Sequence, residues 1–91
     1  MKKVVLDFAG KATPAQIHDY LYASMGFPEY YGRNLDALYD CLSDVCEPTC
    51  VGVYNLDPDN SYHESLAQVL RDAQSDNSSL GVFFAQVEFD E

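Results

Sequence analysis

Three short apolar segments, separated by longer amphipathic stretches, constrain the fold of this chain most strongly. Residues 2–8, 50–56 and 80–87 contain the β-branched and large apolar side chains that are typical of strands. Each connection between them is long enough to hold a helix, as parallel strands require. We therefore expect an α/β fold, a small three-stranded parallel sheet with three to four helices packed on it. Residues 80–87 are apolar on both faces, which predicts a central strand.

Local start and stop signals position the first two helices. Residues 13–16, TPAQ, combine a capping threonine, a proline at the first helical position and a glutamine that completes a capping box. Gly26 is suited to end this helix, because glycine readily adopts the left-handed conformation. Asn34 is a good N-cap, and it predicts a second helix over residues 35–45.

The second half of the chain has similar signals. Ser61 and Glu64 predict a capping box at the start of the last long helix, and residues 76–79 are expected to end it. Residues 57–60, DPDN, have turn chemistry. The bond between Glu47 and Pro48 is a candidate for a cis peptide, as about 5–6% of such bonds are.

Size and charge limit what the chain can bind. Its 91 residues are expected to form one domain, residues 1–91, and 47% hydrophobic content is enough for a packed core. The net charge of −10 would repel phosphate backbones and anionic lipids, so we expect neither nucleic-acid nor membrane binding. An acidic field attracts cationic partners instead. Five of the fifteen acidic residues lie within the nineteen residues from Glu29 to Glu47.

The N-terminus and the cysteines point to a cytoplasmic protein. Asp7 interrupts the first apolar run, so no signal peptide is expected, and no stretch approaches the roughly 20 apolar residues of a membrane span. Three cysteines without a secretory context indicate free thiols, which we expect to be buried or half-buried. Their spacings match no common zinc pattern, even with the two histidines, so we expect neither a metal ion nor a cofactor. The residues concerned are Cys41, Cys46, Cys50, His18 and His63.

Aspartates recur every four residues along the predicted second helix, at Asp36, Asp40 and Asp44. On a helical wheel they lie opposite the apolar side, so they should face solvent. Like charges at this spacing cost about 0.2–0.5 kcal/mol per pair, and aspartate is a poor helix former. Two interpretations remain open here. The stripe is either a solvated face that keeps the protein soluble or a surface that meets a cationic partner.

The segment FPEYYGRNLDALYDCL, residues 27–42, resembles the signature of the barstar family, small cytoplasmic inhibitors of ribonucleases such as barnase. QVLRDA, residues 68–73, is a shorter and weaker match. The resemblance implies a three-stranded parallel sheet with helices packed on it, in agreement with the pattern above. It also implies a protein that is not an enzyme and that blocks the active site of a basic ribonuclease with an acidic helix and the preceding loop.

Residue roles follow from the resemblance by position. Asp40 would take the place of a substrate phosphate, Asp36 would pair with a second basic residue, and Tyr30 would pack on the catalytic histidine of the nuclease. The loop and helix around them would make supporting contacts. The full set of expected partner-binding residues is Tyr30, Gly32, Asn34, Leu35, Asp36, Tyr39, Asp40, Asp44 and Asp72.

Departures from the family pattern leave the target open. Tyr39 and Val45 replace larger or aromatic residues, Asp72 replaces a glutamate, and Arg33 puts a positive charge in the loop. Residues 56–61 are too short for an extra helix that the family has. The alternative function is an immunity protein or binding module of the same fold, directed at a different cationic toxin or partner. An enzyme using two aspartates has no further support in the sequence. We expect a monomer when the protein is free.

Overall fold

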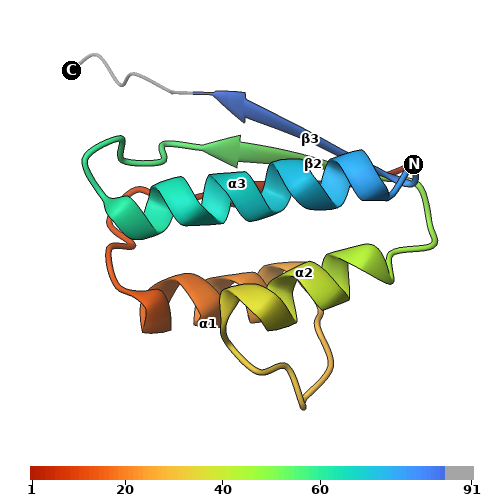
Figure 1. Cartoon of the computed structure of the whole chain (residues 1–91), viewed down its shortest axis with the longest axis horizontal. Helices are drawn as coiled ribbons and strands as arrows, with labels where there is room; N and C mark the ends of the chain where they lie inside the picture. Colours follow the sequence, from red (N-terminus) through yellow and green to blue (C-terminus); the bar gives the residue numbers. More distant parts are fainter. Residues whose placement is uncertain (86–91) are drawn as a thin grey trace.

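The computed structural model describes residues 1–85, in which three strands alternate with three helices (Figure 1). All three strands are parallel and lie in one sheet, in the order β1-β2-β3. This is the α/β fold predicted from the sequence. The elements are β1 (Lys2–Asp7), α1 (Pro14–Met25), α2 (Leu35–Ser43), β2 (Thr49–Tyr54), α3 (Ser61–Asp76) and β3 (Leu80–Ala85).

The helices cover one face of the sheet. Because the strands follow chain order, crossovers of the usual right-handed kind place every helix on the same side, as Figure 1 shows. Alternate residues of each strand point toward them. Leu6 on β1 and Val53 on β2 are each 1% exposed, whereas Val5, one position from Leu6, is 65% exposed.

Helix α2 packs against α3 through its apolar side. Leu38 and Leu42, one turn apart, are buried in the core. Since a helix that buries one side presents the opposite side to solvent, this packing directs the aspartates of α2 outward. The N-cap prediction is confirmed, because the side chain of Asn34 accepts a hydrogen bond from the Ala37 amide at 2.7 Å.

The first helix begins and ends as predicted. Thr13 and Gln16 form the reciprocal capping box, with Pro14 at the first helical position. Gly26 ends the helix in the left-handed conformation, at φ 68°, and its amide donates to the Tyr22 carbonyl. Local cap chemistry therefore fixes both ends of α1.

Three predictions about the other elements are wrong. Helix α2 ends at Ser43, so Asp44 is its C-cap and does not lie inside the helix. The N-cap of α3 is Asn60, whose side chain accepts from two backbone amides, so Ser61 forms no capping box. No peptide bond in residues 1–85 is cis, including the one before Pro48.

The third error concerns β3. It lies at an edge of the sheet rather than at its centre, which β2 occupies. Its apolar outward residues lie on the second face of the sheet, which no helix of residues 1–85 covers and where Phe83 is 46% exposed. The structure describes the strand as far as Ala85, and the predicted continuation over residues 86 and 87 lies outside the described residues.

Candidate functional site

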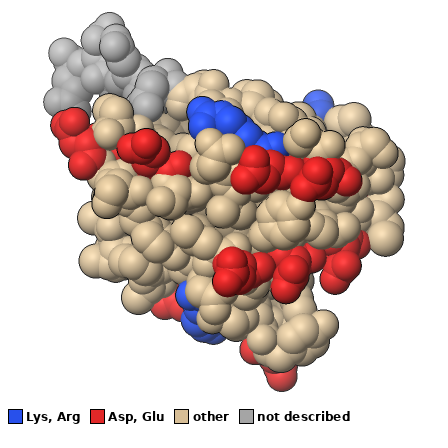
Figure 2. All heavy atoms as spheres, in the orientation of Figure 1, with Lys and Arg blue, Asp and Glu red and all other residues tan. Residues whose placement is uncertain are grey.

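The aspartates of α2 form a row on the surface. Asp36, Asp40 and Asp44 are all exposed, and none of them pairs with a lysine or arginine within residues 1–85. Figure 2 shows this row of acidic side chains over α2, with a second row over α3. Asp36 lies in the first turn, where the helix dipole favours a negative charge, whereas Asp44 at the C-cap gains no such stabilisation.

A tyrosine connects the two rows. The hydroxyl of Tyr39 on α2 donates a hydrogen bond to the carboxylate of Asp76 on α3. This hydrogen bond raises the pKa of Tyr39, because the carboxylate holds the phenol proton. Sequence reasoning missed Asp76, although its spacing of four residues from Asp72 places both on one side of α3. Asp72 itself accepts a hydrogen bond from the Gln68 side chain at 3.0 Å and is exposed.

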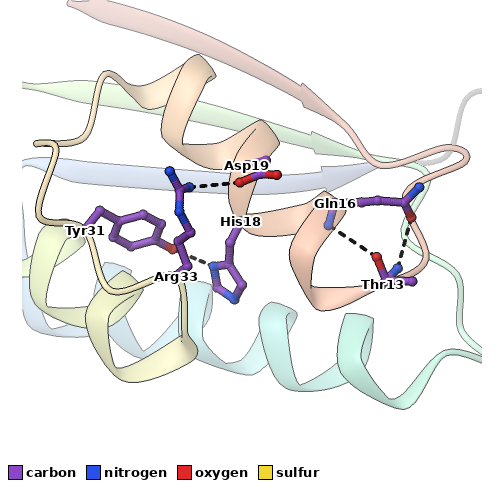
Figure 3. A network of polar contacts seen from close by, with 6 residues as sticks. All are labelled: Thr13, Gln16, His18, Asp19, Tyr31 and Arg33. Carbon is purple, nitrogen blue, oxygen red and sulfur yellow. Dashed lines mark hydrogen bonds and ion pairs between the residues drawn. The ribbon is translucent and has the colours of Figure 1, made fainter.

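Two adjacent tyrosines in the loop before α2 have opposite environments. Tyr30 is 87% exposed, whereas Tyr31 is only 5% exposed. The Tyr31 ring packs on Phe27, with centroids 4.8 Å apart, and its hydroxyl lies 2.6 Å from Nδ1 of His18 on α1 (Figure 3). Tyr31 thus anchors the loop, and the anchored loop presents Tyr30 to solvent.

His18 links the loop to two helices. Its Nδ1 contacts the Tyr31 hydroxyl, and its Nε2 lies 2.6 Å from the hydroxyl of Tyr62 on α3. Burial lowers the pKa of His18, and the nearby Arg33 lowers it further, while Asp19 opposes the shift. Burial also raises the pKa of Tyr31. Burial raises the pKa of Tyr62 as well, so His18, Tyr31 and Tyr62 are uncharged near neutral pH. Both ring nitrogens of the buried histidine have a partner.

Arg33, the positive charge in the loop, bonds to α1. Its Nη1 donates to Oδ1 of Asp19 at 2.9 Å (Figure 3). Its guanidinium lies 4.8 Å from the ring centre of Tyr22. The backbone of Arg33 is left-handed, at φ 52°. The loop is therefore tied to α1 at two neighbouring positions, and the arginine charge is balanced within the molecule.

Between these anchors and α2 lie the small polar residues predicted for the site. Gly32 is exposed, and its carbonyl accepts from the Asn34 side chain at 3.2 Å. A side chain at Gly32 would place its Cβ 3.2 Å from that of Ala37, so the turn is tight. Leu35 is half-buried. Eight of the nine predicted residues thus lie on the loop and α2, and Asp72 lies on the neighbouring α3.

The cysteines differ from expectation in one respect. Cys41 and Cys50 are half-buried, but Cys46 is exposed, because α2 ends before it. Burial, followed by the charges of Asp44 and Asp40, raises the pKa of Cys41. Within residues 1–85, no three His, Cys, Asp or Glu side chains are grouped to hold a metal ion, and no helix is both long and apolar enough to cross a membrane.

The fold and the site define a small α/β protein with a three-stranded parallel sheet, whose second helix displays exposed carboxylates without a cationic partner in residues 1–85. Comparison with known proteins gives the family. Residues 1–87 match the model of the Barstar family, described as barnase inhibitor. "Putative ribonuclease inhibitor YrdF" of Bacillus subtilis (strain 168) is 35% identical over 81 residues, covering 84% of this chain and 89% of the relative. The chain belongs to the barstar family.

Proposed function

We propose that this protein inhibits a basic ribonuclease of the barnase type by covering its active site with one docking surface. The observation that carries the proposal is the row of exposed carboxylates on α2, which have no cationic partner in the described residues. The docking surface comprises Tyr30, Gly32, Asn34, Leu35, Asp36, Tyr39, Asp40, Asp44 and Asp72. Family membership and the name of the Bacillus relative support the same function.

Charge complementarity explains why such a row suits this target. A ribonuclease active site must be cationic, because it stabilises a phosphate that gains negative charge during the reaction. Carboxylates fixed on a helix can accept charge-assisted hydrogen bonds from its arginine, lysine and histidine side chains. We assign the central position to Asp40, as the substitute for a substrate phosphate, and Asp36 to a second basic side chain of the enzyme.

Preorganisation makes these contacts effective. Aspartate has a short side chain and loses little conformational entropy when it is fixed, and Leu38 and Leu42 hold α2 rigidly against the core. The repulsion among the three carboxylates in the free protein is relieved when cations meet them. The repulsion thus destabilises the free protein by a few tenths of a kcal/mol per pair of carboxylates, and binding removes this destabilisation.

The anchored loop supplies the apolar part of the interface. Tyr30 is exposed and rigidly positioned by the buried Tyr31, so its ring can pack on the catalytic histidine of the enzyme. Gly32 lets the partner approach the backbone closely. Asp76 is added to the expected contacts, because it shares a hydrogen bond with Tyr39 on the docking surface. We place this non-enzymatic inhibitor in the cytoplasm, as a monomer at low concentration.

Inhibition assays with a matched control test this function. A purified barnase-type ribonuclease is titrated with the wild-type protein, with Asp40→Ala and with Asp59→Ala, which removes an exposed carboxylate from the turn before α3. Loss of two charged hydrogen bonds, at about 1.5–3 kcal/mol each, should weaken inhibition by Asp40→Ala about 100-fold or more. Asp59→Ala should inhibit like the wild type. Equal potency of all three proteins would place the binding surface elsewhere.

The same assay distinguishes an error about the target enzyme from an error about the docking surface. If the wild-type protein inhibits no barnase-type ribonuclease, the docking surface is directed at a different cationic partner, such as a toxin neutralised by an immunity protein. Binding to that partner would then still depend on Asp40.

A further inference from the structure

The face of the sheet opposite the helices is bare in the described residues and carries apolar side chains. Val5 on β1 is 65% exposed and Phe83 on β3 is 46% exposed, two of the most exposed large apolar residues of residues 1–85. They are in register across the sheet, because Gly52 pairs with Val5 on one side and with Phe83 on the other. Val5, Gly52 and Phe83 therefore form a row across the middle of the three strands.

Gly52 has no side chain, so the aromatic ring of Phe83 can lie against the sheet in this row. A Cβ at Gly52 would lie 2.7 Å from Cζ of Phe83, so the Phe83 ring covers the glycine. The same ring meets Tyr54 edge-on, with centroids 5.9 Å apart. A shallow hollow beside the ring is lined by Val5, Cys50 and Gly52, among others. The result is a mostly apolar surface with a hollow beside the ring, of the kind that marks an interaction site.

The two ends of β1 carry opposite charges on the bare face. Lys3, Val5 and Asp7 alternate with the buried residues of the strand and so share the bare face, with the two opposite charges each two residues from Val5. Oδ1 of Asp7 already accepts hydrogen bonds from the Ala9 amide and the Asn55 side chain, so a contact with a lysine of a second copy would use Oδ2. If two copies stack these faces on each other with a twofold axis parallel to the row of Val5, Gly52 and Phe83, β1 of one copy lies over β1 of the other and runs in the opposite direction. Lys3 would then lie opposite Asp7 of the second copy, at both ends of the interface, and Cys50 would lie opposite the larger Tyr54. Such self-complementarity is the requirement for a twofold interface.

We propose that the bare face of the sheet binds a second copy of this chain, with the two β1 strands antiparallel. The acidic helices lie on the far side of each sheet and keep most of the negative charge apart. Six-residue strands are about 20 Å long and adjacent strands are about 4.8 Å apart, so the contact is smaller than the roughly 800 Å² per partner of a stable complex. The dimer is therefore weak, and the docking surface on α2 remains free in it.

Sedimentation equilibrium over micromolar to millimolar concentrations tests the association. The wild-type chain should show a concentration-dependent dimer, and Phe83→Ser should raise its dissociation constant about tenfold or more, because Phe83 is an aromatic residue at the centre of the contact. Lys3→Glu should also weaken the dimer. Tyr30→Ser, which removes an even more exposed aromatic residue from the loop on the helix side, should leave the dimer unchanged. A wild type that stays monomeric at 1 mM, or a dimer weakened only by Tyr30→Ser, would overturn the proposal.

Disulfide crosslinking tests the orientation. In a chain with Cys41→Ser, Cys46→Ser and Tyr54→Cys, the introduced thiol should face Cys50 of the second copy, so mild oxidation should give a covalent dimer quickly. The matched control omits Tyr54→Cys, and its Cys50 should crosslink slowly, because the two copies of Cys50 do not face each other. Equal crosslinking rates in the two proteins would contradict the antiparallel arrangement.

Discussion

The Tyr31 hydroxyl in the loop before α2 lies 2.6 Å from the ring of His18 on α1, and both residues are buried. A loop residue next to the docking surface is therefore fixed by a histidine whose burial disfavours protonation. Because burial lowers the pKa of His18 in the folded protein below its ordinary value of 6.5, the unfolded chain binds a proton more readily.

This linkage predicts a pH dependence of stability. The free energy of unfolding should fall as the pH decreases from 7.5 to 5.5, since the pH passes below the unfolded pKa of His18 while the folded state resists protonation. Urea unfolding at several pH values measures the slope. In His18→Gln the slope in this window should be much smaller, and an unchanged slope would mean that another group is responsible.

The aspartate row predicts a conflict between stability and binding. Asp40→Ala removes repulsion from Asp36 and Asp44 and introduces a better helix former, so the free protein should become more stable by about 0.5–1 kcal/mol. Thermal or urea unfolding measures this change. Lower stability of Asp40→Ala would show that the carboxylate makes a favourable contact within the free molecule.

The ion pair between Arg33 and Asp19 predicts that substitutions of its two members change the rate of association with a ribonuclease in opposite directions. Arg33→Gly removes a cation near the docking surface and relieves a left-handed backbone, so association with a basic ribonuclease should be about two- to threefold faster. Asp19→Asn frees the arginine and should slow association. Stability should change by less than about 1 kcal/mol in both, because the pair is exposed. Stopped-flow mixing measures the rates, and equal rates would exclude an effect of Arg33.

Electrostatic attraction predicts a strong effect of salt. The association rate with a basic ribonuclease should fall about tenfold or more between low and high ionic strength, because salt screens the acidic surface. Dissociation should change much less. A rate independent of salt would contradict binding through the aspartate row.

The start of α3 offers two adjacent residues that the structure distinguishes. Asn60 caps the helix through its side chain, and it also donates to the Ala12 carbonyl at 3.0 Å. Asn60→Ala should therefore lower the free energy of unfolding by about 1 kcal/mol or more. Ser61→Ala should have little effect, since Ser61 is exposed in the first turn. A larger loss of stability in Ser61→Ala than in Asn60→Ala would instead support the capping box that the sequence predicts.

The sequence predicted those features that depend on neighbouring residues. The ends of α1 and the beginning of α2 follow from cap chemistry within a few positions, and three apolar runs were enough to identify the strands. The N-cap of α3 was predicted wrongly at Ser61 because two adjacent residues were both able to cap the helix, and tertiary contacts selected Asn60. The position of β3 was predicted wrongly because an apolar outward residue such as Phe83 looks the same in a central strand and on an uncovered face.

The placement of the candidate site residues could be foreseen only in part, for a related reason. The spacing of the aspartates and the helical period placed them on the exposed side of α2. The anchors of the loop could not be found in this way, because Tyr31 and Arg33 bond to residues 13 and 14 positions away. Tyr62 is 44 positions from His18, and only the packing of α3 brings them together.

The contrast between Tyr30 and Tyr31 affects how this segment tolerates change. In a library randomised at both codons, a screen for soluble expression should retain an aromatic hydroxyl at Tyr31 and accept many residues at Tyr30. A screen for survival against a toxic nuclease should restrict both. Two identical neighbouring residues would thus be retained for different reasons, one for folding and the other for recognition.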